Sequence, residues 1–255
     1  MAAGRFWIGT SGWHYFHWRG RFYPEELDPH RWLVYYASRF PTVEVNASFY
    51  REPKERTWDT WRRTVPEGFR FAVKAHRFIT HVKRLHECGE ALERQLKNAG
   101  RLRDKLGPLL FQLPPSFQRS DDNVRRLDVF LDLLPVGLAC AFEFRHTSWF
   151  GEETMAQLRR AGVAFCSYDM AGVDCPLVAT TSLAYVRFHG SVLVYHGNYT
   201  DDMLADWAGR LRALARDVDD VYVYFNNDAE GYAVANALRL AELLGAPMPH
   251  VAAIR

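Results

Sequence analysis

Eight short apolar stretches recur along this chain, and each is followed by a helical segment or a long loop. Strands that alternate with helices predict a parallel β-sheet. Eight such units in 255 residues match the size of a closed (β/α)8 TIM barrel, which typically has about 250 residues. The expected strands are residues 5–11, 42–49, 70–76, 107–113, 138–145, 163–169, 183–190 and 221–227.

Helix signals fill most of the connections. Asp28 and Pro29 start a helix with an apolar face that runs to Phe40, and Gly245 ends the last helix. Only residues 171–181 lack a convincing helix. The other expected helices are residues 53–61, 79–87, 91–105, 121–134 (capped by Asp121 or Asp122), 152–160, 201–216 and 230–244.

No linker or low-complexity tract divides the chain, so we expect residues 1–255 to form a single domain. A doubly wound open sheet is the main alternative fold. Its phosphate-binding fingerprint is absent, because Gly9-Thr-Ser-Gly12 does not make GxGxxG. The barrel is therefore the better prediction.

Composition narrows the class of protein. A formal net charge of +2 does not indicate a nucleic-acid-binding protein. The N-terminus lacks the apolar core of a signal peptide, and no apolar run approaches the roughly 18 residues of a membrane span. The four cysteines show no CxxC pair. We expect a cytoplasmic protein without disulfides or membrane partners; its oligomeric state is not predictable from sequence.

Polar side chains appear where the apolar strands end. In the stretch from Leu138 to Phe150, Glu143 and Arg145 share one face, because strand side chains alternate. The carboxyl ends of barrel strands form the active-site face in enzymes of this fold. The polar residues at these ends are Thr10, Ser11, Glu44, Asn46, Lys74, His76, Gln112, Glu143, Arg145, Asp169, Arg187, His189, Asn226 and Asp228.

These residues have the chemistry of an anion-binding site. Lysine and arginine hold phosphate or carboxylate, arginine in bidentate fashion. The expected cations are Lys74, Arg145 and Arg187, together with His76 and His189. The candidates for proton transfer are Glu44, Glu143, Asp169 and His189. The amides expected to orient hydroxyl groups are Asn46, Gln112 and Asn226.

Structural ion pairs are the alternative interpretation, for instance Glu143 with Arg145 or Arg187, or Glu44 with Lys74. A metal site is a further alternative, with Glu44, His76 and Asp169 as its ligands and Glu143 and His189 as other possible donors. No HxH or HExxH spacing supports it, and three cations nearby would repel a metal. We therefore predict no metal or other cofactor.

Aromatic residues cluster in the loops that follow the strands, where rings can stack on bases or sugars. Most of them are expected simply to pack over the barrel, and Trp13 and Tyr50 are the favoured exceptions. The cluster comprises Trp13, Tyr15, Phe16, Trp18, Phe49, Tyr50, Trp149, Phe150, Tyr195 and Tyr199.

Several longer motifs resemble the DUF72 family, the YecE-like proteins. They are Ile8-Gly-Thr-Ser-Gly-Trp13, Phe22-Tyr-Pro24, Thr42-Val-Glu-Val-Asn46, Ser48-Phe-Tyr50, Lys74, Ile79-Thr-His81, Phe111-Gln-Leu-Pro-Pro115, Glu143-Phe-Arg-His146, Tyr185-Val-Arg-Phe-His-Gly190 and Tyr224-Phe-Asn-Asn-Asp228. The resemblance implies a bacterial or archaeal TIM barrel and leaves the function open. The family's barrel has been compared with endonuclease IV, which implies DNA binding by analogy. This chain has fewer carboxylates and imidazoles than a three-metal site needs.

Three functions remain at this point. The leading hypothesis is an enzyme that uses acid/base chemistry on a small or terminal anionic, phosphorylated or carboxylated, sugar-like substrate. The second is a metal-dependent phosphodiesterase or DNA-binding protein of the endonuclease IV type. The third is a ligand-binding module without turnover.

Overall fold

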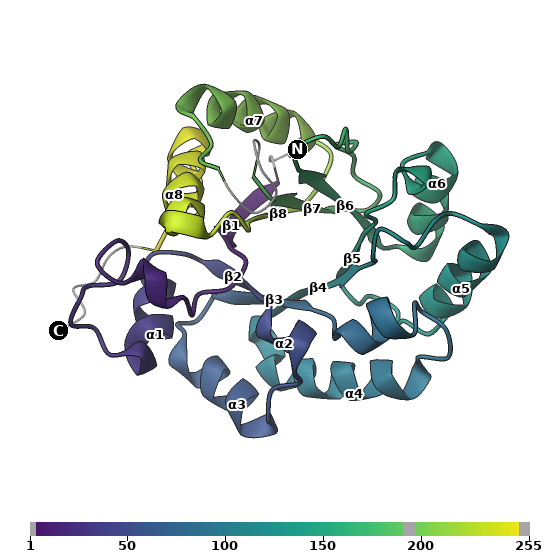
Figure 1. Ribbon diagram of the computed structural model, residues 1–255, viewed down its shortest axis with the longest axis horizontal. Helices are drawn as coiled ribbons and strands as arrows, with labels where there is room; N and C mark the ends of the chain where they lie inside the picture. The colour runs from purple at the N-terminus through teal and green to yellow at the C-terminus, as the bar shows by residue number, and fades with distance from the viewer. Residues whose placement is uncertain (1–3, 191–196, 250–255) are drawn as a thin grey trace.

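The eight predicted strands form one parallel sheet that curves into a nearly closed barrel (Figure 1). The structure is a computed structural model and describes residues 4–190 and 197–249, so Tyr195 lies outside the described residues. Around the barrel the strands follow the order β1-β8-β7-β6-β5-β4-β3-β2, which confirms the predicted fold. Their bounds are β1 Arg5–Thr10, β2 Thr42–Val45, β3 Arg70–Lys74, β4 Leu106–Gln112, β5 Cys140–Glu143, β6 Ala164–Asp169, β7 Leu183–Phe188 and β8 Asp220–Phe225.

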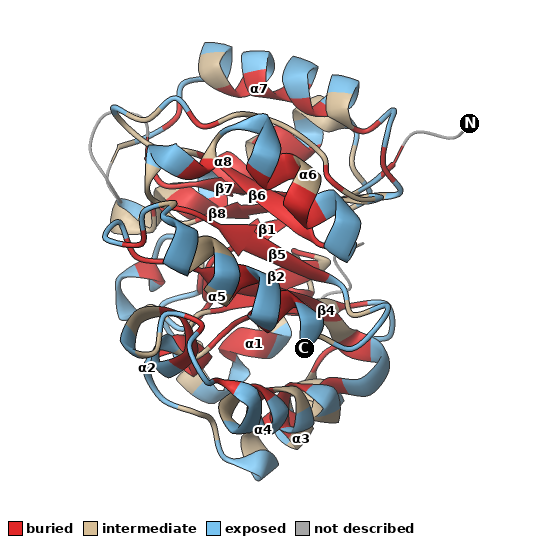
Figure 2. Ribbon diagram, turned by 90° about the vertical axis from the view of Figure 1, so that its right-hand side faces the viewer, coloured by how far each residue is buried: buried red, intermediate tan, exposed pale blue. Residues whose placement is uncertain are grey.

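Helices surround the barrel and turn one face toward it, and their outer faces are exposed (Figure 2). This arrangement explains their amphipathic sequences. The α-helices are α1 Trp32–Ala37, α2 Ala47–Tyr50, α3 Glu55–Thr64, α4 Gly89–Ala99, α5 Asp121–Asp132, α6 Glu152–Ala161, α7 Asp201–Leu214 and α8 Tyr232–Leu244. The short turns of helix are η1 Phe16–Trp18, η2 Pro29–Arg31, η3 Phe78–Val82, η4 Gly100–Lys105, η5 Thr147–Trp149 and η6 Ala229–Gly231.

Several details differ from the sequence predictions, and three of them bear on the site and the helix caps. The strand expected to reach Phe49 ends at Val45, and α2 follows it. The helix expected over residues 79–87 is a short π-helix, η3, followed by turns, because Arg84 and Leu85 have φ angles of 49° and 65°, which a right-handed helix cannot contain. The cap of α5 is the Ser120 side chain, which accepts a hydrogen bond from the backbone of its third helical residue.

The join between β1 and β2 is the weakest part of the barrel wall. The two strands meet at a single bridge between Ser11 and Glu44. Gly9 faces β2 so closely that a Cβ at this position would lie 2.3 Å from the backbone oxygen of Thr42. A residue without a side chain is needed for that approach.

Mainly apolar side chains fill the lower part of the barrel interior. They include Ala72, Leu110, Ala141 and Tyr185. Because strand side chains alternate, the residue two positions further along each strand points inward at the next level. That level consists of Lys74, Gln112, Glu143 and Arg187, so the alternation places the polar residues together at the carboxyl ends.

Within the residues that the structure describes, no helix is both long and apolar enough to cross a membrane. The four cysteines lie buried as free thiols, so the barrel carries no disulfide between them. Burial raises the pKa of Cys140 and of Cys175 to about 12.

Candidate active site

A buried arginine joins two carboxylates inside the barrel. Arg187 donates from Nη2 to Oε1 of Glu44 at 2.7 Å and from Nη1 to Oε2 of Glu143 at 2.8 Å. The side chains of all three residues are 0% exposed. The predicted ion pair between Glu143 and Arg187 is therefore present, and Arg187 rather than Lys74 pairs with Glu44.

Glu44 is held by further hydrogen bonds. Tyr185 donates its hydroxyl to Oε2 at 2.7 Å, and the Ser11 hydroxyl bonds to Oε1. Asn46 then donates from Nδ2 to Ser11 Oγ at 2.7 Å. These contacts satisfy the carboxylate from several directions and fix its orientation.

Arg145 lies above Glu143 and makes three different contacts. Its Nε pairs with Glu143, its Nη2 lies 2.8 Å from Nε2 of His189, and its Nη1 lies 3.0 Å from the sulfur of Met170. The guanidinium also covers the ring of Tyr168 at 4.8 Å. A thioether is a weak hydrogen-bond acceptor, so Nη1 has the weakest of these partners.

The surroundings of Glu143 and His189 fix their charge states. Burial alone would raise the pKa of Glu143, but Arg145, Arg187 and His189 outweigh it and hold that pKa well below its usual value. Burial, assisted by the two arginines, lowers the pKa of His189 to about 3. A guanidinium only donates, so Nε2 of the neutral imidazole accepts from Arg145, and Nδ1 faces the side-chain amide of Asn226 at 3.1 Å.

Lys74 is a buried cation that forms no ion pair within the described residues. Its exposure is 8%, and its Nζ lies 4.2 Å from the centre of the Phe49 ring. No hydrogen bond joins this Nζ to any other described residue. Burial, together with Arg187, lowers its pKa to about 7, although Glu44 and Glu143 oppose this shift. Lys74 is therefore the cation in this site whose charge changes near neutral pH.

His81 also lies beside this lysine and was missed as a site residue. It belongs to the π-helix η3, and its ring packs against Phe49 with centroids 4.9 Å apart. Burial and then Lys74 lower its pKa to about 4. The available signal was the motif Ile79-Thr-His81 in the connection that follows the third strand. The structure shows a π-helical turn there, and such turns often mark functional sites.

The structure does not bring every predicted residue to this cluster. Asp169 accepts a hydrogen bond at 2.6 Å from the hydroxyl of Tyr199, which packs against the outward-facing Phe188. His76 lies beyond the end of β3, where its backbone N–H donates to Gln95 and its side chain lines a separate cavity of about 150 Å³. Both side chains therefore lie apart from the cluster around Arg187.

The residues considered for a metal are separated for the same reason. Glu44 bonds to Arg187, Tyr185 and Ser11, whereas His76 and Asp169 lie elsewhere. Across residues 4–190 and 197–249, no group of three or more histidine, cysteine, aspartate and glutamate side chains is arranged to hold a metal ion. The residues present do not fit the proposed ligand set.

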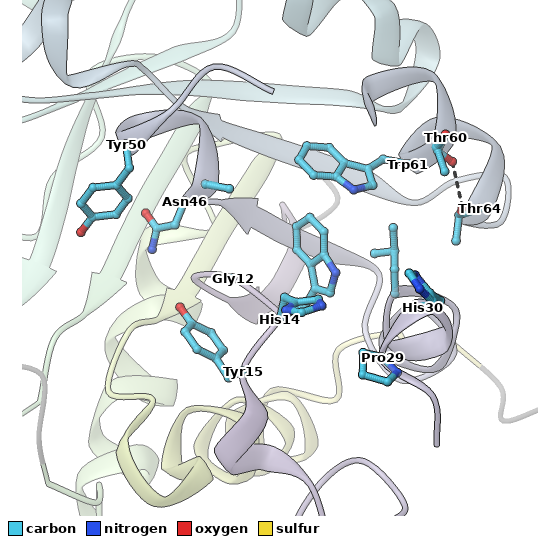
Figure 3. A pocket seen from close by; sticks show the side chains of 13 residues that line it. Gly12, His14, Tyr15, Pro29, His30, Asn46, Tyr50, Thr60, Trp61 and Thr64 are labelled. Atoms are coloured by element: carbon cyan, nitrogen blue, oxygen red, sulfur yellow. Dashed lines mark hydrogen bonds between the residues drawn. The ribbon is translucent and has the colours of Figure 1, made fainter. Parts of the chain in front are cut away.

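Beside the strand ends lies a cavity of about 600 Å³ (Figure 3). Trp13 and Tyr50, the two favoured aromatic residues, both line it. Trp61 of α3 lines it too, although the sequence predicted it only as the last residue of a short helix. Asn46 contributes both to this cavity and to the hydrogen bonds around Glu44.

Comparison with known proteins gives the family. A model of the DUF72 family, described as a protein of unknown function, matches residues 7–254. The chain belongs to the DUF72 family. It is also 30% identical over 272 residues to the UPF0759 protein YunF of Bacillus subtilis (strain 168), an alignment that covers 93% of this chain and 94% of YunF. The resemblance of its motifs to DUF72 is thereby confirmed.

Solved structures of DUF72 proteins share this barrel. TM1631 from Thermotoga maritima MSB8 has a TM-score of 0.85 at 32% identity, and the match covers 94% of this chain and 99% of that one. EF0366 from Enterococcus faecalis V583 has a TM-score of 0.84 at 22% identity, covering 95% and 96% of the two chains. A glycoside hydrolase family 5 enzyme from Prevotella bryantii B14 matches with a TM-score of 0.50 at 11% identity, covering 94% and 96%, which shows a common fold alone.

Proposed function

We propose that this DUF72 protein is an enzyme that binds a small or terminal anionic, sugar-like molecule at the carboxyl ends of the strands and acts on it by acid/base chemistry. The observation that carries the proposal is the buried Lys74, which has no anionic partner among the described residues. A buried charge is costly unless it is paired. A phosphate or carboxylate group of a ligand would supply the missing partner.

Arg145 provides the second contact for that anion. Its Nη1 reaches only the thioether of Met170 among the described residues, and a phosphate or carboxylate oxygen is a much stronger acceptor. Arg187 has a different role, because Glu44 and Glu143 already occupy its guanidinium. We assign it to holding the two carboxylates in position.

Proton transfer falls to Lys74 in this proposal. A group is most effective as an acid or base when its pKa lies near the working pH, and that of Lys74 is lowered to about 7. His189 stays neutral and Glu143 stays ionised near pH 7, so both serve to orient Arg145 and the substrate.

Amide groups around the mouth are suited to bind hydroxyls. The Oδ1 atom of Asn46 is buried without a hydrogen-bond donor. The side chain of Gln112, 9% exposed, forms no hydrogen bond within the described part of the chain. A sugar-like molecule offers hydroxyl groups that can both donate and accept. This is why we favour a hydroxylated anion over a simple acid.

The proposal is tested by anion binding and by turnover. Isothermal titration calorimetry with inorganic phosphate and with gluconate should show binding that weakens as the pH rises above about 7, where Lys74 loses its charge. Lys74→Met should weaken binding about ten-fold or more, which corresponds to a lost charged contact. Lys97→Met is the matched control, because Lys97 is exposed on α4.

Turnover separates an enzyme from a binding module. The protein is incubated with a panel of phosphorylated and carboxylated sugars, and conversion is followed by NMR. We expect at least one compound to be converted, and Glu143→Gln and His189→Ala to slow that conversion. Anion binding that is lost in Lys74→Met, with no compound converted, would favour a ligand-binding module instead.

A further inference from the structure

We propose that the 600 Å³ cavity beside the strand ends is a subsite for a second, neutral sugar ring, so that the substrate is a two-ring sugar with one anionic end. This inference rests on the proposed function, because it places the charged end at Lys74. The inference adds that the charged end of the substrate is attached to a second, neutral sugar ring.

The cavity has the size and lining of a small-molecule site. Such sites measure about 300–1,000 Å³ and combine apolar walls with a few polar groups. Figure 3 shows Asn46, Tyr50 and Tyr15 on one side of the cavity and Trp61 and His30 on the other. The side with Asn46 is the one that adjoins the charged cluster.

A polar atom in this cavity lacks a partner. Oδ1 of Asn46 is buried without a hydrogen-bond donor. An unpaired polar group inside a protein is costly, and a ligand hydroxyl would satisfy it. The indole N–H groups of Trp13 and Trp61 form no hydrogen bond within the described residues and can also donate to a ligand. The cavity therefore selects a ring that carries hydroxyl groups around its edge.

The aromatic geometry favours a sugar ring over a flat aromatic one. Trp13 and Trp61 meet edge to face, with centroids 5.1 Å apart and planes at 83°. A flat ring gains most from stacking on parallel faces, and these two indoles do not form a parallel pair. A sugar ring instead places its C–H face on one indole and directs its hydroxyl edge toward the other.

Asn46 connects the cavity to the charged cluster. It lines the cavity, and its Nδ2 donates at 2.7 Å to Ser11, whose Oγ also accepts from Arg187 at 3.1 Å. Tyr15 lines the same wall and donates its hydroxyl to the backbone oxygen of Ser11 at 2.7 Å. One ligand can therefore occupy both places, with its two units joined near Asn46.

The test compares anions that differ only by a second ring. Binding is measured by isothermal titration calorimetry for glucuronate against the disaccharide glucuronosyl-glucose and for glucose 6-phosphate against trehalose 6-phosphate. Adenosine 5′-phosphate against inorganic phosphate serves as the flat-ring comparison. We expect the two-ring member of at least one sugar pair to bind about ten-fold more tightly, and adenosine to add less than the second sugar.

Substitutions in the cavity wall test whether the preference for the second ring arises there. Trp61→Ala should abolish the preference for the second ring and leave binding of the one-ring anion unchanged. Tyr50→Ala should reduce that preference, and because Tyr50 is 71% exposed its removal leaves the packing of the core unchanged. Phe78→Ala is the control, because this exposed aromatic residue lines the separate small cavity.

The outcomes distinguish this inference from the proposed function. The subsite is overturned if the two members of each sugar pair bind equally tightly. It is also overturned if the preference for the second ring survives in both Trp61→Ala and Tyr50→Ala. In either case the one-ring anions still bind, so the proposed function stands. A larger gain from adenosine than from a sugar ring overturns it in favour of an aromatic ligand. If no sugar anion binds, both proposals fail.

Discussion

Arg187 on β7 lies 2.7 Å from Glu44 on β2, although β8 and β1 separate these two strands in the barrel wall. The contact spans the interior and has no access to solvent. Glu143 on β5 bonds to the same guanidinium, so three strands that are not neighbours are connected through one side chain. The polar layer of the barrel is thus part of its stability as well as of its candidate site.

Arg187→Met should be strongly destabilising, because it leaves Glu44 and Glu143 buried without their shared partner. The expected loss in the free energy of unfolding is about 3–5 kcal/mol. Urea denaturation followed by circular dichroism measures it. Arg239→Met is the control: its ion pairs with Asp201 and Glu242 are exposed and should contribute nothing detectable. A wild-type-like midpoint for Arg187→Met would contradict the buried pairing.

Lys74→Met should stabilise the protein in a pH-dependent way. The folded state lowers the pKa of Lys74 from 10.5 to about 7, so the unfolded chain binds this proton more tightly and wild-type stability rises between these two pH values. Below about pH 7 the variant should be more stable by about 1–4 kcal/mol, as when other buried charges are replaced by apolar groups. The difference should shrink toward pH 10.5, and a constant difference would argue against a buried ammonium.

His189 should remain neutral in mildly acidic solution. Its pKa falls from 6.5 in the unfolded chain to about 3 in the fold, so its contribution to stability is present above about pH 6.5 and is lost as the pH falls toward 3. Nitrogen-15 NMR of the imidazole at about pH 5 should show the neutral ring, whereas the same histidine in urea should be charged. A charged ring in the folded protein would rule out its acceptor role toward Arg145.

Gly9→Ala and Gly209→Ala should have opposite effects. A Cβ at Gly9 would lie 2.3 Å from the backbone oxygen of Thr42, so β1 and β2 must separate, at a cost of about 1–3 kcal/mol. Gly209 lies in α7 with nothing within 4 Å of an added Cβ, so alanine should stabilise the helix by about 0.5–1 kcal/mol. Thermal unfolding of the two variants measures both changes in stability. An unchanged stability for Gly9→Ala would mean that β1 and β2 can move apart without cost.

The sequence predicted the barrel well because each strand carries its own apolar run and ends in polar residues. The shared inward face of Glu143 and Arg145, and that of Arg187 and His189, followed from strand alternation alone. The direction of Asp169 did not, because β6 is buried on both faces and its sequence shows no alternation of polarity.

Other parts of the site depend on contacts that no local pattern reveals. The sequence alone suggests that Lys74 pairs with Glu44. The structure shows that Arg187 forms this ion pair instead, which leaves Lys74 without an ion pair among the described residues. The contribution of Trp61 to the cavity depends on where α3 packs. Its position in the sequence is equally consistent with a tryptophan that only packs this helix against the barrel. His76 was misplaced because the chain leaves the strand direction directly after Lys74.

The incomplete pairing of β1 and β2 has a consequence for how this protein could change its ligand. The loop after β1 and the segment after β2 form much of the wall around Asn46, and the two strands themselves share one bridge, from Ser11 to Glu44. Glu44 lies on this seam, whereas Arg187 and Glu143 lie on β7 and β5, away from it. Substitutions in the two segments beyond the bridge, at Trp13 or Tyr50, can therefore change which molecule is recognised while the pair of Arg187 and Glu143 keeps its place.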